Sequence, residues 1–396
     1  MKSRKSLILF AIFFIVYEFN AYIANDMIMP GMIKVVTEFN SPLENIAKSL
    51  SLFIIGGSSL QIFLGPLCDR YGKRNILLFG NVLFILTTIL ITMVVNIDQF
   101  LLARCLQGFG LCFIFIGYAM IHELFDDKDA VKLCSLVANI AVFAPLIGPV
   151  IGSAIIVNHN WRYVFIVTAV LAIISFLGLA KNMPNNKPDQ KNPNIKEIIK
   201  IYKTIFSTKT LIKGGLIISI SALPMIGWIG LAPVLVMKTL GKGFEEYVIY
   251  QVIVFGGFII SSVGIQFMAG RFSFYSLITR GSIVGLLGLA ISCIGHNYIP
   301  LFIGGLFIAS LGVGIFNGSI FIFAITSTGA SNSMSAASLN IVQSLSMACG
   351  LEIINYLSSI WNFSILSFSA LNLTAGIVTT LLCFNFANQI RSREWQ

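Results

Sequence analysis

Charged residues inside long apolar segments are the first places to look for chemistry in this chain. Glu18, Tyr22 and Asp26 recur at every fourth position of an apolar run near the start, so a helix would carry all three on one face. A carboxylate in such surroundings loses hydration and its ionised form is disfavoured, which suits a group that takes up and releases protons. For each carboxylate the alternative is a structural role, holding its helix to a neighbour.

Arg104 and Glu352 are charged side chains within later apolar runs, and Arg280 lies near enough to the inner edge of another for its side chain to reach the surface. Arg104 begins the sequence Arg-Cys-Leu-Gln-Gly-Phe-Gly, whose glycines let helices approach closely. A guanidinium keeps its proton, so Arg104 is interpreted as an electrostatic partner of the carboxylates or as a structural contact. Glu352 stands alone in its run, and two interpretations stay open: a hydrogen-bonded structural group or a second acidic contact for a ligand.

Prolines and glycines alternate in a fifth apolar run. Between Ala144 and Gly152, the residues Pro145, Gly148 and Pro149 share helical spacing with Gly152. Proline kinks a helix, and glycine lets a neighbouring helix approach closely. The pattern predicts a helix that bends and packs tightly; a kink without a mechanistic role is the alternative.

A short polar loop between two apolar runs concentrates charges of both signs. Because a carboxylate is stabilised at a helix N-terminus, Asp69 is expected to act as a latch that engages in one conformation and is released in another. Ordinary topogenic charge is the simpler explanation. The residues predicted to form the latch are Gly65, Asp69, Arg70, Gly72, Lys73 and Arg74.

These residues need a membrane-spanning framework to position them. Of the 396 residues, 57% are hydrophobic and 11% are charged, and the mean hydropathy of +0.89 lies far above that of soluble domains. Runs of about 20 apolar residues, long enough to cross a bilayer as helices, recur between short polar breaks. The sequence therefore predicts an all-α membrane protein with twelve transmembrane helices, at 7-29, 46-67, 76-96, 99-121, 133-156, 161-180, 212-236, 248-268, 274-295, 299-323, 334-357 and 364-389.

The distribution of positive charge predicts the orientation. Most of the 26 Lys and Arg residues fall in breaks on the side of the N-terminus, which the positive-inside rule assigns to the cytoplasm. Both termini are expected there, and the net charge of +10 reflects topology and lipid headgroups rather than nucleic acid. The first apolar run lacks a cleavage site and is interpreted as a helix, not a signal peptide. The seven Cys residues lack metal-ligand spacing, so neither a metal nor a disulfide is expected.

The longest polar break divides six predicted spans from six. It contains Pro184, Pro188 and Pro193 among lysines and asparagines, a composition typical of a linker. We predict a six-helix lobe at 1-181, a cytoplasmic linker at 182-211 and a second six-helix lobe at 212-396. Within the linker, 195-209 has apolar residues at helical spacing among lysines, which predicts a short amphipathic helix on the membrane surface.

The chain resembles a known family at these motifs. The stretch from Gly65 to Arg74 resembles the signature loop of the major facilitator superfamily, and 104-110 resembles its fourth-span motif. The stretch 144-152 is similar to the antiporter motif of its drug:proton antiporter branch. Residues 17-19 and 22-32 are similar to the first helix of bacterial multidrug transporters in that branch, and the similarity extends through 223-229 and 350-353.

The resemblance implies roles for individual residues. Glu18 and Asp26 would serve protons and cationic drugs, and Arg104 would take part in proton coupling. Val137 stands where the family has a methionine, a departure that affects the expected drug spectrum rather than the mechanism. The expected central drug cavity is lined by Tyr22, Asn25, Asp26, Gln107, Leu111, Val137, Ala141, Pro145, Met225, Ile229 and Met347, with Asn139 and Glu352 as further polar contacts.

The expected function is proton-coupled export of lipophilic, often cationic drugs by alternating access, in a bacterial inner membrane. No cofactor is expected beyond the proton gradient, and the chain has no Walker-type sequence. Expected partners are the lipid bilayer, small lipophilic substrates and protons, with no nucleic acid, and a monomer is expected to function. One alternative is a dedicated carrier, exporter or importer, of one metabolite such as a siderophore. A membrane-embedded enzyme or receptor is disfavoured, since the histidines lie at loop edges.

Overall fold

The computed structural model describes residues 4–185, 195–267 and 271–394, and within these ranges it contains helices and no strands. Ten of the described helical segments are long and apolar enough to cross a bilayer, and a bent pair makes an eleventh. The predicted all-α membrane fold is confirmed. The predicted fifth span lies in a further helix whose described apolar stretch, Phe143–Asn158, is shorter.

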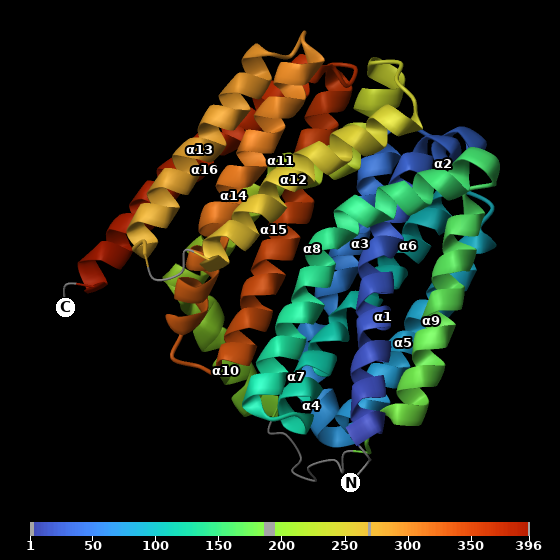
Figure 1. The fold of residues 1–396 in the computed structure, drawn as a ribbon, viewed down its shortest axis with the longest axis vertical. Helices are drawn as coiled ribbons and strands as arrows, with labels where there is room; N and C mark the ends of the chain where they lie inside the picture. Colours follow the sequence, from blue (N-terminus) through green and yellow to red (C-terminus); the bar gives the residue numbers. More distant parts are fainter. Residues whose placement is uncertain (1–3, 186–194, 268–270, 395–396) are drawn as a thin grey trace. The chain divides into compact units, whose positions relative to one another are not determined.

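Two compact units make up the chain: the first unit, Met1–Ile199, and the second unit, Lys200–Gln396. The division lies inside the predicted linker, and the lobe boundaries at 181 and 212 stay predictions. The helices of the first unit (Figure 1) are α1 (Arg4–Ile28), η1 (Met29–Gly31), α2 (Met32–Glu38), α3 (Glu44–Ser59), α4 (Gln61–Tyr71), α5 (Lys73–Thr92), α6 (Ile97–Cys112), α7 (Ile114–Leu124), α8 (Asp127–Asn158) and α9 (Arg162–Asn182).

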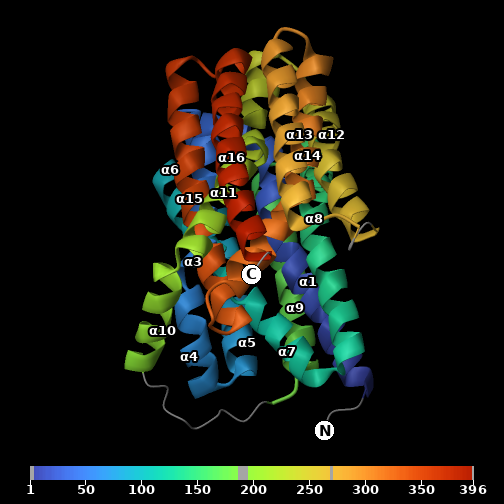
Figure 2. The same ribbon diagram turned by 90° about the vertical axis from the view of Figure 1, so that its left-hand side faces the viewer.

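Most helices of the second unit are 21 to 30 residues long. A short helix, α10 (Ile195–Ser207), lies across the division between the units, within the stretch 195-209, and the amphipathic role on the membrane surface stays a prediction. The other helices (Figure 2) are α11 (Lys209–Ala232), the π-helix η2 (Pro233–Thr239), α12 (Phe244–Phe267), α13 (Phe274–Ile294), α14 (Ile299–Thr326), α15 (Asn332–Ile360) and α16 (Ile365–Glu394).

Several elements differ from the predicted spans. The first span continues through η1, which contains Pro30, into α2 and ends at Glu38. The second span is broken at Leu60, where α3 and α4 meet at 41°. The predicted polar loop from Gly65 to Arg74 is mostly helical, because α4 runs to Tyr71 and α5 starts at Lys73.

A cluster of aromatic and aliphatic side chains forms the core of the first unit. α1 packs against α8 and α9 (Figure 1), and its Phe10, Phe14 and Tyr17 are fully buried. The Tyr17 hydroxyl donates to the carbonyl of Gly110 at 2.7 Å, and its ring meets Phe84 edge-on. The side chain of Tyr17 therefore holds α1 against α6 through a hydrogen bond and against α5 through an aromatic contact.

Contacts within the first unit hold the C-terminal extension of the first span in place. At α2, the Glu38 carboxylate accepts a hydrogen bond from the Trp161 indole at 2.7 Å and pairs with Arg162 at 2.6 Å. Arg162 also donates to the carbonyls of Thr92 and Val94. These contacts connect α2 with the ends of α5 and α9 at one end of the unit.

Glycines set the packing of the second unit. α13 and α14 lie side by side (Figure 2), and their contact depends on small residues. A Cβ added at Gly312 would overlap the backbone nitrogen of Gly285, and one added at Gly288 would overlap that of Ala309. Such backbone-to-backbone contact is how transmembrane helices associate where lipid gives no hydrophobic driving force.

Candidate functional site

Arg104 is the centre of a hydrogen-bond network in the first unit. Its side chain is fully buried in α6 and donates to Asn25 of α1, to Gln107 at 2.6 Å and to Ser49 of α3 at 3.2 Å. Its guanidinium also stacks over the Phe53 ring, 4.5 Å from the ring centroid. Each of its three guanidinium nitrogens thus donates one hydrogen bond, which offsets part of the cost of burying the charge.

Asp26 is joined to this network through an amide. Asn25 accepts a hydrogen bond from Arg104 and donates to the Asp26 carboxylate at 3.3 Å. Asp26 is 6% exposed, and among the described ion pairs none joins Asp26 directly to Arg104. Asp26 and Arg104 therefore interact through Asn25 and through the electrostatic field, without a direct contact.

Glu18 occupies a separate site two turns along α1. Its side chain is 1% exposed, and one carboxylate oxygen accepts a hydrogen bond at 2.9 Å from the hydroxyl of Tyr118 in α7. The other oxygen, Oε2, has no hydrogen-bond partner among the described residues. A buried carboxylate with one free oxygen is more easily accommodated when that oxygen carries a proton.

The glycines of α8 pack directly against the backbone of α1 at Asp26. A Cβ on Gly148 would lie 2.6 Å from the Cβ of Asp26, and one on Gly152 would overlap the carbonyl oxygen of Met27. α8 is one continuous helix from Asp127 to Asn158 and includes both prolines. The glycine-containing face of α8 therefore packs against the turn of α1 that carries Asp26.

The residues predicted as a latch make contacts within their own unit. Lys73 forms an ion pair with Glu123 of α7, and Arg74 donates to the carbonyl of Ala180 at 2.6 Å. Asp69 and Arg70 are exposed. Gly72 has a φ of 84°, which only glycine adopts readily, and it ends α4. These contacts join α5 to α7 and α9, and the latch role itself stays a prediction.

The remaining predicted cavity residues divide between the two units. In the first unit, Tyr22, Leu111 and Pro145 are half-buried and Val137 is buried. The side chains of Asn139 and Ala141 lie outside the part that the structure describes. The second-unit candidates are Met225 and Ile229, which are buried, and Met347 and Glu352, which are half-buried.

Two of the second-unit candidates have distinctive surroundings. Met225 lines a small pocket of about 20 Å³ together with the hydroxyl residues Ser221, Ser282 and Ser310, room for about one water molecule. The Oε1 atom of Glu352 is buried without a hydrogen-bond partner among the described residues. Neither residue joins a charged network like that of Arg104.

Sequence analysis missed the residues that complete the two acidic sites. Ser49, Phe53 and Thr88 surround Arg104 and Gln107, and Thr88 accepts a hydrogen bond from Gln107 at 2.9 Å. Tyr118 is the partner of Glu18. These are ordinary residues in apolar runs with partners up to 100 positions away, so only the fold reveals them.

An apolar helix bundle that buries two carboxylates and an arginine defines a class of protein, the polytopic membrane transporters. The family model of the Major Facilitator Superfamily matches residues 14–351. The chain belongs to the Major Facilitator Superfamily, and it is therefore a transporter rather than an enzyme.

Individual relatives agree with this assignment. The multidrug transporter MdfA of Yersinia pestis bv. Antiqua (strain Angola) is 34% identical over 382 residues, 95% of this chain and 93% of its own. The multidrug resistance protein MdtM of Escherichia coli O157:H7 is 30% identical over 387 residues, 96% of this chain and 94% of its own. Among solved structures, a D-xylose-proton symporter matches with a TM-score of 0.73 at 16% identity, covering 93% of this chain and 97% of its own.

Proposed function

We propose that this protein is a proton-coupled exporter of lipophilic, often cationic drugs, in which Glu18 and Asp26 carry the exchanged protons. The observation that carries the proposal is the arrangement in the first unit: Asp26 is connected to the buried Arg104 through Asn25 without a direct ion pair. The names of two relatives, a multidrug transporter of Yersinia pestis and a multidrug resistance protein of Escherichia coli, support the substrate class.

The coupling follows from competition for one buried carboxylate. With Asp26 ionised, its charge and that of Arg104 nearly cancel, and a cationic drug gains a favourable site. With Asp26 protonated, the uncompensated guanidinium repels the cation. Drug and proton therefore bind in alternation, so proton entry can drive drug release once the protein opens to the other side.

Glu18 provides the second exchangeable proton. Its free Oε2 atom and its bond to Tyr118 suit a carboxyl group that is protonated in one state and ionised in the other. The candidate drug contacts are Tyr22, Asn25, Gln107, Leu111, Val137, Asn139, Ala141, Pro145, Met225, Ile229, Met347 and Glu352.

The wider setting belongs to the same proposal. The lobes 1-181 and 212-396 alternate access in a bacterial inner membrane, with both termini in the cytoplasm, powered by the proton gradient without a bound cofactor. A single chain suffices. Gly65, Asp69, Arg70, Gly72, Lys73 and Arg74 act as the conformational latch, and Pro145, Gly148, Pro149 and Gly152 keep α8 close to Asp26.

The test is proton release on adding tetraphenylphosphonium, a lipophilic cation, to purified protein in weakly buffered detergent. Wild type is expected to release protons as it binds. Asp26→Asn and Glu18→Gln, folded as judged by thermal unfolding, are each expected to release fewer. Binding without any proton release by wild type contradicts the coupling, and failure to bind this or other lipophilic cations points to a dedicated metabolite carrier.

A further inference from the structure

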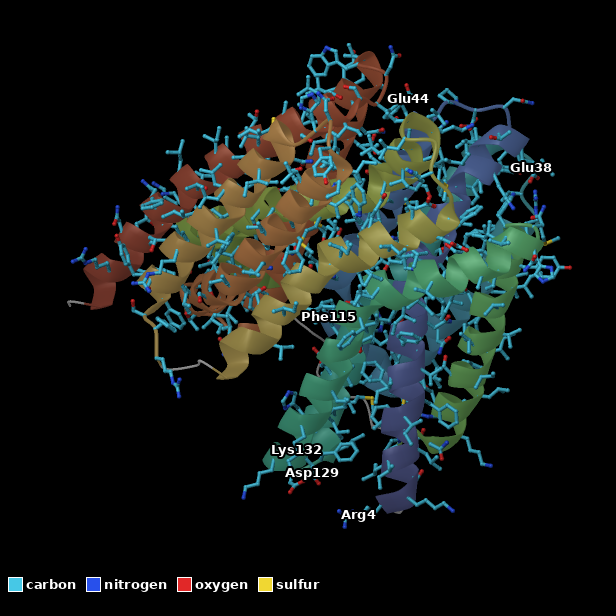
Figure 3. The ribbon with its side chains drawn as sticks, turned by 45° about the horizontal axis from the view of Figure 1, so that its top comes forward. Arg4, Glu38, Glu44, Phe115, Asp129 and Lys132 are labelled. Carbon is cyan, nitrogen blue, oxygen red and sulfur yellow. The ribbon has the colours of Figure 1, made fainter. Side chains whose placement is uncertain are left out.

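The small pocket of the second unit is lined by hydroxyl groups that the proposed function does not use. It lies among α11, α12, α13, α14 and α16, and most of the residues around it are buried. Figure 3 shows side chains filling the space between the ribbons of these helices, so the pocket is a space among packed side chains. The lining residues that carry a hydroxyl group are Ser221, Ser282, Ser310, Thr379 and Thr380.

One of these hydroxyl groups has no partner in the described protein. Thr379 of α16 is 5% exposed, and its Oγ1 atom makes no hydrogen bond to any described residue. Thr380, the next residue, donates to the carbonyl of Gly376 at 2.9 Å, which is the bond that a threonine inside a helix can make to its own backbone. Burying a hydroxyl group without a partner is unfavourable, so a partner for Thr379 is expected within the pocket.

The proline of α11 brings a backbone carbonyl group to the same pocket. Pro224 lies inside α11 and has no N–H, so it cannot donate to the carbonyl of Ile220, four residues earlier. Ile220 and Pro224 both line the pocket, together with Ser221 and Met225 of the same helix. The turn of α11 that lacks a backbone hydrogen bond therefore borders the pocket that Thr379 also lines.

The other hydroxyl groups at the pocket use their protons within the protein. Each donates to a backbone carbonyl: Ser221 to Ile218, Ser282 to Thr279, Ser310 to Val254 and Thr380 to Gly376. A hydroxyl oxygen that has donated its proton still accepts hydrogen bonds through its lone pairs. The pocket is therefore rich in acceptors, and Thr379 has the hydroxyl group whose proton is free to be donated.

This chemistry fits a neutral molecule of the size of water. Among the described residues that line the pocket, none is charged, so a cation would lack the compensating charge that it needs in an apolar interior. An apolar molecule would leave the hydroxyl of Thr379 without a partner. Water donates twice and accepts from Thr379, and the volume of about 20 Å³ accommodates about one such molecule.

We propose that the pocket is a binding site for one ordered water molecule, which accepts a hydrogen bond from the Thr379 hydroxyl and donates one to the Ile220 carbonyl. The water replaces the bond that Pro224 cannot make, and it joins α11 to α16. Ordered water is one of the means by which a membrane-spanning helix tolerates a proline. The site is independent of the proton and drug sites of the proposed function.

X-ray radiolysis followed by mass spectrometry tests for the water directly, because hydroxyl radicals formed from a bound water oxidise the side chains around it. Phe316 of α14 lines the pocket and is 1% exposed, so bulk solvent does not reach its ring. Wild-type protein is expected to show oxidised Phe316. Thr379→Val, which keeps the shape and loses the hydroxyl group, and Pro224→Ala, which restores the N–H for Ile220, are each expected to lose this oxidation.

Two aromatic residues near the start of α14 serve as references. Phe302 is fully buried and is not among the residues that line the pocket, so it should stay unoxidised in every variant. Tyr298 is exposed and should be oxidised equally in all of them. An unoxidised Phe316 in wild type overturns the proposal, and so does equal oxidation of Phe316 in wild type and in Thr379→Val.

The sign of the change in thermal stability gives an independent test. If Thr379 bonds to a water, Thr379→Val removes a hydrogen bond and should lower the unfolding midpoint by about 2 °C. In a dry pocket the same variant removes an unpaired hydroxyl group, so a raised midpoint overturns the proposal. Thr374→Val is the matched control on α16, because Thr374 is exposed and donates to the carbonyl of Ala370 in its own helix; it should leave the midpoint unchanged.

Discussion

The two units of this chain differ in the hydrogen bonds that join their helices. The first unit joins helices through side chain to side chain bonds around charged groups, as at Arg104, Asn25 and Gln107. In the second unit, hydroxyl groups reach across to backbone carbonyls, as Ser310 does to Val254 and Thr380 to Ser282. The first arrangement is sensitive to proton and charge, and the second is not.

This difference suggests a division of labour. A network built on ionised groups changes its energy when one proton arrives, whereas glycine contacts and hydroxyl-to-carbonyl bonds do not. We therefore expect coupling to depend on the first unit and the second unit to serve mainly as a tightly packed body that contributes apolar substrate contacts. Four sets of variants sharpen or break this comparison.

Arg104→Met should have the largest effect. It leaves Asn25, Ser49 and Gln107 without their donor and Asp26 without its positive neighbour, so we expect a loss of about 3 kcal/mol in the free energy of unfolding and no coupled export. Arg104→Lys should keep part of the stability and little export, because an ammonium group cannot make the three hydrogen bonds of the planar guanidinium in the same geometry. Denaturant unfolding and drug efflux from cells measure both.

The exposed Arg280 of the second unit is the matched control. Arg280→Met should change neither property by more than the uncertainty of the measurements. An equal loss in both variants would contradict the division between the units.

Glycine substitutions should have the next largest effect. Gly152→Ala and Gly288→Ala each create an overlap with a neighbouring helix backbone, and each should lower the unfolding midpoint, equivalent to about 2 kcal/mol. Only Gly152→Ala displaces the turn of α1 that carries Asp26, so only this variant should also lose ligand-linked proton release. Gly304→Ala, where a Cβ meets open space, should be neutral or slightly stabilising.

Buried amides offer a smaller contrast. Gln107 of the first unit uses both ends of its amide, whereas neither end of the buried Asn372 amide has a partner among the described residues. Gln107→Leu should therefore cost about 2 kcal/mol, and Asn372→Leu should be neutral or stabilising by about 1 kcal/mol. Thermal unfolding in detergent distinguishes the two. A large loss of stability or export in Asn372→Leu would assign that amide a functional partner.

Glu352→Gln should have the smallest effect. Glu352 is half-buried, and its Oε1 atom has no hydrogen-bond partner among the described residues, so the amide should leave stability within about 0.5 kcal/mol and export of lipophilic cations within about twofold. Efflux of ethidium and of a neutral drug from cells measures the change. If export of the cation alone collapses, Glu352 is the second acidic contact that the sequence left open.

The sequence predicts the charged and small residues of the site but not their partners. Spacing within one helix is a local signal, which is why the stripe of Glu18 and Asp26 and the glycines of α8 can be found without a structure. The contact between Gly148 and Asp26, and that between Tyr118 and Glu18, join distant segments. Local patterns carry no information about such pairs.

The fold shows the same limit. Hydropathy predicts the helices, because only long apolar segments can cross a bilayer. It cannot predict the break at Leu60, the interruption at Phe113 or the π-helix that starts at Pro233. These depend on how each helix packs against its neighbours, and all three lie within otherwise continuous apolar sequence.

The most direct test of coupling in the first unit is transport in proteoliposomes under an imposed pH gradient. Wild-type protein and Arg280→Met should move tetraphenylphosphonium against its concentration gradient when protons flow the other way, and Glu18→Gln combined with Asp26→Asn should not. Gradient-driven transport by the doubly substituted protein, at the wild-type rate, would contradict the account and place the proton-carrying groups elsewhere in the chain.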